Sequence, residues 1–429
     1  MNKVLLLLLL ICAAPAHAAG LSAQERRIAA AVQAHQAEHL LLLEQLVNIN
    51  SGTLNPAGVR QVAELLRPRF EALGMRVRWL PMDPVGRAGH LLAEQRGGRG
   101  ARLLLIAHLD TVFEADSPFQ RYQREGDTAV GPGVNDIKGG IVVILAALQA
   151  LHEAGALSRS NITVFLSGDE ERPGQPLAIA RRDLLAAGAA SDIALDFEAM
   201  YREQNQDTLH LGRRGSLSWK LWASGDSGHS AGVGRGAGYG AVYELVRIID
   251  AFRTQLPEPD LSYNAALIAG GSSLQLDAQG VNANASGKPN IIAAQAYATG
   301  DLRALSPEQV ARVQARMRGI VAQHLDRTQA RIEFDEAYPP MAPGAGSAAL
   351  FEQMQRINRD LGLGELRLGD PANRGAGDIS FVGQLPGLVG MGLAGGGAHA
   401  VGEYADLRSL VPQAQRAALL MLRLSRPHP

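Results

Sequence analysis

Acidic and imidazole side chains stand at the ends of several apolar segments of this 429-residue sequence. The run ARLLLIA ends in HLDTV, so His108 and Asp110 are two residues apart and would leave the same face of a strand. Further along, NITVFLS is followed by GDEE, with carboxylates in a row at residues 169–171. Neighbouring carboxylates repel one another unless a cation or a proton offsets the repulsion. Together with neutral imidazoles they are ligands for a divalent metal.

Three more segments carry side chains of the same types. Asp136 lies in GPGVNDIKGG, Asp196 and Glu198 lie in LDFEAM, and His399 follows AGGGA. If these segments are strand ends or the turns after them, their side chains converge at one edge of a sheet and form a metal site. The residues alone leave Asp196 and Glu198 as alternative ligands, since the two point to the same face.

The elements around these residues alternate in type, which favours an α/β fold. We expect strands at ARLLLIA, NITVFLS and DIALDF, and helices at IVVILAALQALHEAG and LAIARRDLLAAG. This alternation is typical of a mostly parallel sheet with helices on both faces. Sites in such folds lie beyond the carboxyl ends of the strands. Two amphipathic helices, the second with Asn55 as N-cap, are expected before the first strand.

The pattern changes between residues 211 and 326. The alternating LHLGRRGSLSWKLWASG is followed by a helix, further strands and a helix opened by Ser306 and Pro307. This order predicts a small α+β domain inserted into the larger one. The expected organisation is a signal peptide over residues 1–18, a catalytic domain over 19–210 and 327–429, and the insert over 211–326, after which the parallel pattern resumes near RIEFDEAYPP.

Composition and the N-terminal segment indicate the cellular setting. The formal net charge is −1 and no basic tract indicates a nucleic-acid partner. Residues 1–18 combine one lysine, an apolar run too short to span a bilayer and small residues around His17, which is typical of a secretory signal peptide. We therefore expect a periplasmic or secreted protein with no membrane span once the signal is removed. The single cysteine, Cys12, lies in the signal, so the mature chain would have no disulfide.

The segments HLDTV, GPGVNDIKGG, GDEE, DFEA and GGGAHA resemble, in order and spacing, the motifs of the dizinc aminoacylase and carboxypeptidase family. That family includes glutamate carboxypeptidases, acetylornithine deacetylases and succinyl-diaminopimelate desuccinylases. The chain looks most like the exported bacterial glutamate carboxypeptidases. The resemblance covers essentially the whole mature chain and implies two zinc ions, with cobalt or manganese as substitutes.

The resemblance also implies a role for each site residue. Asp136 would bridge the two metal ions, with Glu170 as general base and Asp110 orienting a histidine ligand. The remaining ligands would be His108 and Glu198 for one ion and Glu171 and His399 for the other, with Glu198 preferred to Asp196.

The insert resembles the dimerisation domain of the same family, which implies a homodimer. Within it, Arg303 of GDLRAL would bind the terminal carboxylate of the substrate, a use that suits its planar fork. Asn290 of GKPN would help to fix that carboxylate, and His229 of GHSAG would reach a neighbouring active site to stabilise the oxyanion.

The resulting hypothesis is an exported zinc exopeptidase that removes a C-terminal residue, such as glutamate, from a small peptide or an N-acyl amino acid. The alternative within the family is an aminoacylase, a deacylase or an aminopeptidase-like enzyme, because the metal site is common to all of them. From another class, a periplasmic binding protein without catalysis would also suit an exported two-domain chain. Such a binder does not need GDEE beside a histidine and an aspartate.

Overall fold

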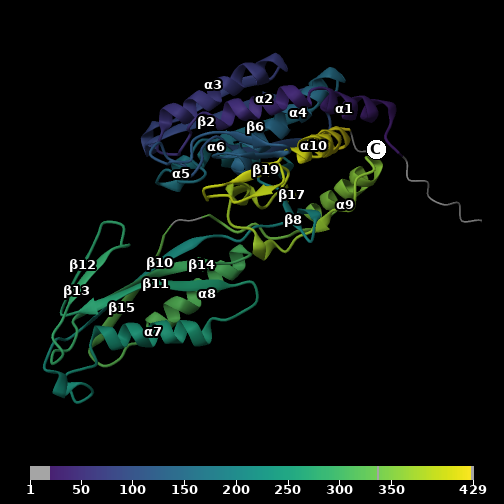
Figure 1. Cartoon of the computed structure of the whole chain (residues 1–429). Coiled ribbons are helices and arrows are strands. Elements are labelled where there is room, and N and C mark those ends of the chain that lie inside the picture. The colour runs from purple at the N-terminus through teal and green to yellow at the C-terminus, as the bar shows by residue number, and fades with distance from the viewer. Residues whose placement is uncertain (1–19, 336–337, 427–429) are drawn as a thin grey trace, which may run out of the picture.

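The computed structural model describes residues 20–335 and 338–426, which form a larger and a smaller domain (Figure 1). The predicted signal peptide, residues 1–18, lies outside the described residues. The chain leaves the larger domain and returns to it through two adjacent segments, which pair at the isolated bridges Arg213 to Met341 and Ser216 to Tyr338. We call residues 213–216 and 338–341 the hinge.

The larger domain is built on a six-stranded sheet with the order β1-β2-β6-β3-β7-β17. Its strands are β1 (Arg76–Met82), β2 (Arg87–Gln95), β3 (Arg102–His108), β6 (Asn161–Ser167), β7 (Ile193–Asp196) and β17 (Gly387–Val389). The last four are mutually parallel, so the predicted α/β class is confirmed. The other two form an antiparallel edge, because the short turn η1 (Asp83–Val85) joins them and only antiparallel strands accept so short a link.

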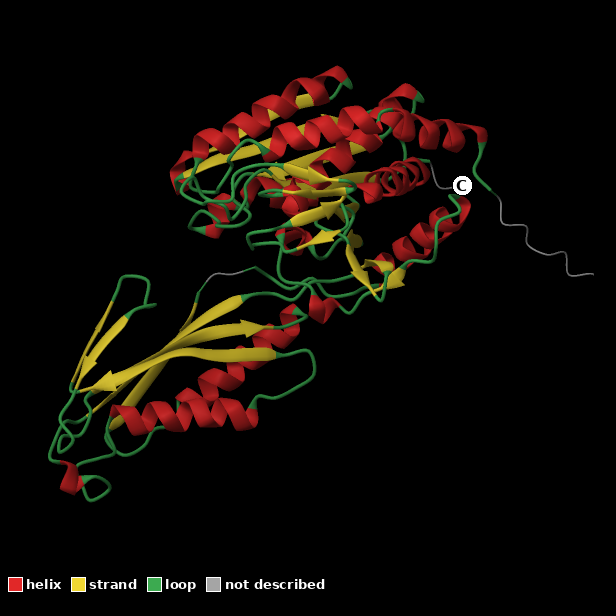
Figure 2. Cartoon of the chain, in the orientation of Figure 1, coloured by secondary structure: helices red, strands yellow, loops and turns green. Residues whose placement is uncertain are grey.

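Helices cover both faces of this sheet (Figure 2). Leu103 and Leu105 of β3 belong to the core formed with α1 (Ala23–Ala34), α2 (Gln36–Val47), α3 (Pro56–Ala72), α4 (Gly139–Glu153), α9 (Ala345–Asp360) and α10 (Leu410–Leu424). Leu104 and Ile106 face the other way, toward α6 (Arg182–Ala189), which follows the short α5 (Leu177–Ala180), and the turn η6 (Asp378–Val382). This alternation follows from the two-residue period of a strand, which brings His108 to the second face.

The two predicted N-terminal helices need one refinement. The helical pattern that starts at Ser22 is divided at His35 into α1 and α2. The next helix, α3, begins at Pro56, and the Asn55 side chain accepts a hydrogen bond from the main-chain N–H of Gly58, as the capping pattern predicts.

One helical stretch of the described residues, Val134–Glu153, is long and apolar enough to cross a membrane, and 94% of its apolar window is buried inside the protein. It comprises α4 and the turn before it, and α4 contacts α1, α2 and α10. Its apolar character therefore fits the central helix of a globular core.

The smaller domain has the predicted α+β composition. Its antiparallel sheet has the order β11-β14-β10-β15, with β10 (Leu217–Gly225), β11 (Ser262–Gly271), β14 (Gln295–Arg303) and β15 (Thr328–Phe334). The helices α7 (Ala241–Gln255) and α8 (Pro307–Val321) pack on one face, and the hairpin β12 (Ser273–Leu276) and β13 (Ala283–Ser286) extends beside the sheet (Figure 1).

The insert ends later than the sequence pattern indicates. The segment RIEFDEAYPP, expected to resume the parallel sheet after residue 326, instead contributes β15, which pairs antiparallel with β10 in the smaller domain. Ile332 and Phe334 alternate with charged residues, which is typical of an antiparallel strand with one covered face and not of a parallel strand covered on both faces. The return to the larger domain comes at the hinge, near Tyr338.

Candidate metal and catalytic site

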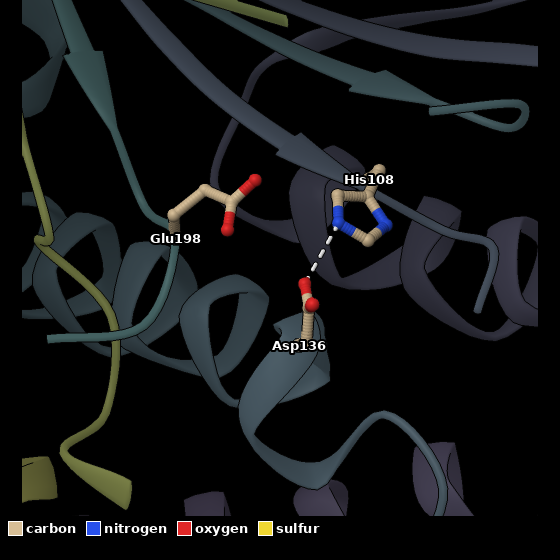
Figure 3. A group of neighbouring side chains, drawn as sticks. All are labelled: His108, Asp136 and Glu198. Atoms are coloured by element: carbon tan, nitrogen blue, oxygen red, sulfur yellow. Dashed lines mark hydrogen bonds and ion pairs between the residues drawn. The ribbon is translucent and has the colours of Figure 1, made fainter. Parts of the chain in front are cut away.

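The first group of site residues converges at the carboxyl ends of β3 and β7 (Figure 3). His108 is the last residue of β3, Asp136 lies in the turn η2 (Val134–Lys138) before α4, and Glu198 comes two residues after β7. The Nε2 atom of His108 lies 3.1 Å from Oδ1 of Asp136. One nitrogen or oxygen from each of the three side chains lies within 4.8 Å of the others, which is a spacing suited to a metal ion.

A second group of the same kind shares Asp136. The Nε2 atom of His399 lies 3.1 Å from Oδ2 of Asp136 and 3.1 Å from Oε2 of Glu171. The two oxygens of one carboxylate therefore face two different imidazoles, and the groups His108, Asp136, Glu198 and Asp136, Glu171, His399 lie side by side. Such an arrangement would suit the bridged pair of metal ions that the family resemblance implies.

The donor set fits metal ions on the evidence of its own atoms. Oε1 of Glu171 is buried, and within the described part of the chain no hydrogen bond satisfies it. Burial, together with the nearby Asp136 carboxylate, raises the pKa of Glu171 to about 7. A buried carboxylate beside another carboxylate is costly, and a bound cation would offset that cost.

Glu170 belongs to neither group, although charged residues of both act on its carboxylate. Desolvation by the surrounding protein raises the pKa of Glu170 well above its usual range, although His108 opposes the shift, and the Glu198 and Glu171 carboxylates raise it further. A raised pKa makes a carboxylate a stronger base, which suits the acceptance of a proton from water.

Asp110 has a broader positioning role than the sequence indicates. Nδ1 of His108 lies 3.0 Å from the main-chain oxygen of Asp110 and 3.5 Å from its Oδ1, so main chain and side chain both face the imidazole. The Asp110 carboxylate also accepts hydrogen bonds from the main-chain N–H groups of Glu170 at 3.0 Å and Glu171 at 3.1 Å, and from Oγ1 of Thr53 at 2.6 Å. One buried aspartate thus connects the HLDTV segment to the GDEE segment.

Arg213, a residue that sequence reasoning missed, contacts both Asp196 and Glu198, the two candidates for the third ligand. Asp196 accepts a hydrogen bond from Nη1 of Arg213 at 2.8 Å and another from the main-chain N–H of Glu198 at 3.3 Å. The same nitrogen of Arg213 lies 3.2 Å from Oε1 of Glu198, and of the two carboxylates Glu198 lies in a candidate metal group. Arg213 lies 17 positions away from Asp196 in the sequence, and no local pattern links them.

Glu403 is a second residue without a sequence signal. Its buried carboxylate accepts hydrogen bonds from the main-chain N–H groups of Gly133 at 3.1 Å, Asn135 at 2.7 Å and Asp136 at 2.8 Å. It therefore fixes the turn that carries the shared aspartate, from 267 positions away in the chain.

The first carboxylate of GDEE serves a different purpose from the other two. Asp169 pairs with Nη1 of the buried Arg181 at 2.6 Å, and Arg181 also lies 2.9 Å from Asp378. Arg181 donates to the hydroxyl oxygen of Tyr338 at 2.8 Å, and that hydroxyl donates to the main-chain oxygen of Glu170 at 2.7 Å. This buried network supports the loop that carries Glu170.

The three predicted substrate residues of the smaller domain occupy its two ends. Arg303 is the last residue of β14 and lies near the hinge, since the main-chain N–H of Gly215 donates to the main-chain oxygen of Ala304, the residue after Arg303. The Nε atom of Arg303 donates to the Asp301 carboxylate at 3.0 Å. His229 and Asn290 lie together beyond the opposite end of β10, where the main-chain N–H of Ser230 donates to the oxygen of Asn290 at 3.0 Å. The structure thus does not bring His229 and Asn290 together with Arg303 within one chain.

Comparisons with known proteins agree with this geometry. The chain is similar to carboxypeptidase G2 of Pseudomonas sp. (strain RS-16), with 27% identity over 89% of this chain and 88% of that protein. It is also similar to a succinyl-diaminopimelate desuccinylase of Leptothrix cholodnii, with 32% identity over 45% of this chain and 52% of the relative. Among solved structures, the fold is similar to that of the Bacillus subtilis YXEP protein, described as a dinuclear metal binding peptidase from the M20 family. That match has a TM-score of 0.65, 14% identity and coverage of 92% of this chain and 99% of the other.

The model of peptidase family M20/M25/M40 matches residues 104–423, a span that includes all the metal-site residues described above. Within that span, the two candidate metal groups, which share Asp136, lie in one site. A match over most of the chain together with an intact site makes the protein an enzyme of the hydrolase class. The chain belongs to peptidase family M20/M25/M40.

Proposed function

We propose that the protein is a zinc-dependent exopeptidase that hydrolyses the amide bond to a C-terminal amino acid, with glutamate as a candidate, in a small peptide or an N-acyl amino acid. The observation that carries this proposal is the Asp136 carboxylate shared by two metal-type groups, with Glu170 beside them. The similarity to carboxypeptidase G2 along most of the chain supports carboxypeptidase activity within the family.

Zinc suits the donor set of imidazole nitrogens and carboxylate oxygens, and cobalt or manganese would be substitutes. His108, Asp136 and Glu198 would hold one ion, and Asp136, Glu171 and His399 the other. When bound, the ions would polarise the scissile carbonyl and make the attacking water more acidic.

Glu170 performs the proton transfers in this proposal. Its carboxylate takes the proton of the attacking water and returns it to the nitrogen of the leaving amino acid. The same group must act first as base and then as acid, and the place of Glu170 beside residues of both metal-type groups suits both steps. Asp110 and the Arg181 network hold the loop on which Glu170 lies.

Arg303 is the proposed recognition residue for the carboxylate of the leaving amino acid. Its side chain is 37% exposed, and its contact with Asp301 orients the guanidinium at the hinge end of the smaller domain. An arginine fork binds a carboxylate through charge-assisted, often bidentate hydrogen bonds. Asn290 would assist from a second chain, because within one chain it lies at the opposite end of the smaller domain from Arg303.

A homodimer through the smaller domain is part of the proposal. Helix α7 carries exposed apolar side chains at Val242, Tyr243 and Val246, which are 38%, 59% and 52% exposed. Such a patch on one helix face is typical of a protein interface. A second copy would also explain His229, since this exposed histidine lies beyond the end of β10 that is remote from the hinge.

The alternative function, an aminoacylase, deacylase or aminopeptidase-like activity, keeps the same metal site and Glu170. The similarity to a desuccinylase over half of that relative favours keeping this alternative. The aminopeptidase-like activity differs from the proposed one, because its substrate needs no free carboxylate next to the cleaved bond.

The decisive experiment therefore compares a good peptide substrate with its C-terminal amide, using the parent enzyme and Arg303→Ala. Each change should lower kcat/KM by about thirtyfold, which corresponds to about 2 kcal/mol for a hydrogen bond to a charged group. The two losses should not add, because both remove one contact. Full activity of the parent on the amidated substrate would move the aminopeptidase-like alternative to first place.

We further propose that the mature enzyme is exported to the periplasm or secreted. Support comes from the composition of residues 1–18, with a single lysine before an apolar run and small residues at the expected cleavage point. Fractionation of cells that produce the full chain or a chain lacking residues 1–18 tests this, and retention of both in the cytoplasm would contradict export.

A further inference from the structure

Arg213 occupies an unusual place in the molecule, because its main chain belongs to the hinge and its side chain to the metal site. Its main-chain N–H and oxygen exchange two hydrogen bonds of 2.9 Å with Met341. Its guanidinium is buried, and Nη1 lies 2.8 Å from Oδ2 of Asp196 and 3.2 Å from Oε1 of Glu198. One nitrogen thus contacts a candidate metal ligand and the carboxylate that competes with it.

The rest of the guanidinium is held equally firmly. Nε donates to the main-chain oxygen of Gly375 at 2.6 Å, and Nη2 donates to that of Ala376 at 2.6 Å. A Cβ atom at Gly377 would lie 2.1 Å from Nη1, so only a glycine leaves room for this placement. Hydrogen bonds and ion pairs from Nε, Nη1 and Nη2 therefore fix the orientation of the Arg213 guanidinium.

We propose that Arg213 is a positioning residue for the metal centre, which directs the Glu198 carboxylate toward the ion shared with His108 and Asp136 and holds Asp196 in an ion pair away from that ion. This inference rests on the proposed metal centre. The inference adds Arg213 to that centre as the residue that selects the third ligand of one ion. The other ion would be bound by Asp136, Glu171 and His399 as before.

Charge bookkeeping supports a selective effect. One guanidinium nitrogen contacts two carboxylates, so it can pair with one of them and leaves the other for a cation. Without Arg213, two buried carboxylates would stand side by side, and such a pair takes up a proton or separates. In either case Glu198 becomes a poorer and less well-directed ligand.

Arginine and lysine differ in a way that separates positioning from charge. Lysine keeps the positive charge but lacks the planar fork that reaches Gly375, Ala376 and both carboxylates at once. If Arg213 acted only by charge, Arg213→Lys would restore the site. If it acts by position, the lysine variant should remain impaired.

The test measures Zn²⁺ and Co²⁺ binding to the metal-free full-length protein by calorimetry and by Co²⁺ absorption, independently of activity. The parent should bind two equivalents. In Arg213→Gln and Arg213→Lys, one equivalent should weaken by about 10–100-fold, the usual effect of losing a partner of a metal ligand, while the other stays unchanged. The matched control is Arg214→Gln, the adjacent arginine, whose Nη1 instead donates to Ser262 of the smaller domain.

A double-variant comparison identifies the affected ion. The loss from Arg213→Lys should not add to that from Glu198→Ala, which removes the same ligand, and should add to that from His399→Ala at the other ion. A folded Arg213 variant that binds both equivalents as tightly as the parent, or more tightly, would overturn the proposal. A parent protein that binds fewer than two equivalents would instead contradict the proposed function, so the two failures are distinguishable.

Discussion

Three consecutive carboxylates after β6 have three different surroundings, and the surroundings rather than the residue type separate their roles. Asp169 is neutralised by Arg181 at 2.6 Å, and Glu171 faces His399 at 3.1 Å. Glu170 is the member whose pKa is raised well above its usual range by desolvation, with further carboxylates beside it. The proposed proton-transfer role rests on this difference, because Glu170 is the one of these three carboxylates that neither pairs with Arg181 nor belongs to a metal-type group.

At this scale we expect Glu170→Gln to keep both metal ions and lose most of its activity. Glutamine has the same shape but cannot take a proton from water, so kcat should fall by about two to four orders of magnitude. Elemental analysis of the purified variant, next to its kinetics, checks both parts. The exposed Glu64→Gln on α3 is a matched control and should behave like the parent. Ordinary turnover by the Glu170 variant would remove this residue from the reaction.

The secondary-structure elements bring residues that are distant in the sequence next to one another. The contacts between elements stabilise this arrangement. Helix α1 is fixed to α10 by Glu25, whose Oε1 lies 2.9 Å from Nε of Arg423. Glu25 also accepts a hydrogen bond from the main-chain N–H of Ser22 at 2.8 Å and so completes a capping box. Burial alone would raise the pKa of Glu25, but the bonds with Ser22 and Arg423 outweigh it and lower that pKa to about 2.

The pH dependence of stability should report this contact. Glu25 has a lower pKa in the folded protein than its ordinary value of 4.5, so its contribution is present above pH 4.5 and is lost as the pH falls toward 2. Glu25→Gln should therefore destabilise the protein by about 2 kcal/mol at pH 7, and by much less near pH 2. Thermal unfolding of the metal-free protein across this range measures the difference. A gap between variant and parent that stays constant with pH would contradict the assignment.

At the scale of the whole molecule, the smaller domain separates residues that the resemblance assigns to one active site. Arg303 lies at the hinge end of the sheet, and His229 lies beyond the other end of β10. The nine residues of β10 span roughly 30 Å at about 3.3 Å per residue. The proposed dimer would resolve this separation, because a second copy would bring its own His229 to the first copy's metal site.

Complementation between two inactive variants tests this arrangement. Co-production of His229→Ala and Glu170→Gln chains should restore activity, since a mixed dimer has one site with both residues intact. With random pairing, about one quarter of all sites would be complete. Light scattering of the same sample measures the oligomeric state, and a Val246→Glu change on α7 should prevent the rescue. A mixture no more active than its separate components would place His229 outside a shared site.

Much of the site was predictable because its signals are local. Each of three segments can be identified from a few consecutive residues: the strand that ends in histidine, the glycine-rich turn with Asp136 and the acidic GDEE segment. The parallel sheet then brings these segments together at one edge. The α/β class and the small α+β insert followed from the same short-range periodicities. The roles of these residues stay predictions until the binding and kinetic experiments are done.

What only the tertiary structure decided is carried by contacts between distant residues. Glu403 holds the Asp136 turn from 267 positions away, and Arg213 contacts both Asp196 and Glu198 through a guanidinium whose remaining partners are main-chain oxygens. The end of the insert depended on the pairing of β15 with β10, which its alternation allows but does not specify. Periodicity and short motifs report a residue's neighbours along the chain, whereas ion-pair partners and strand neighbours are chosen by packing in three dimensions.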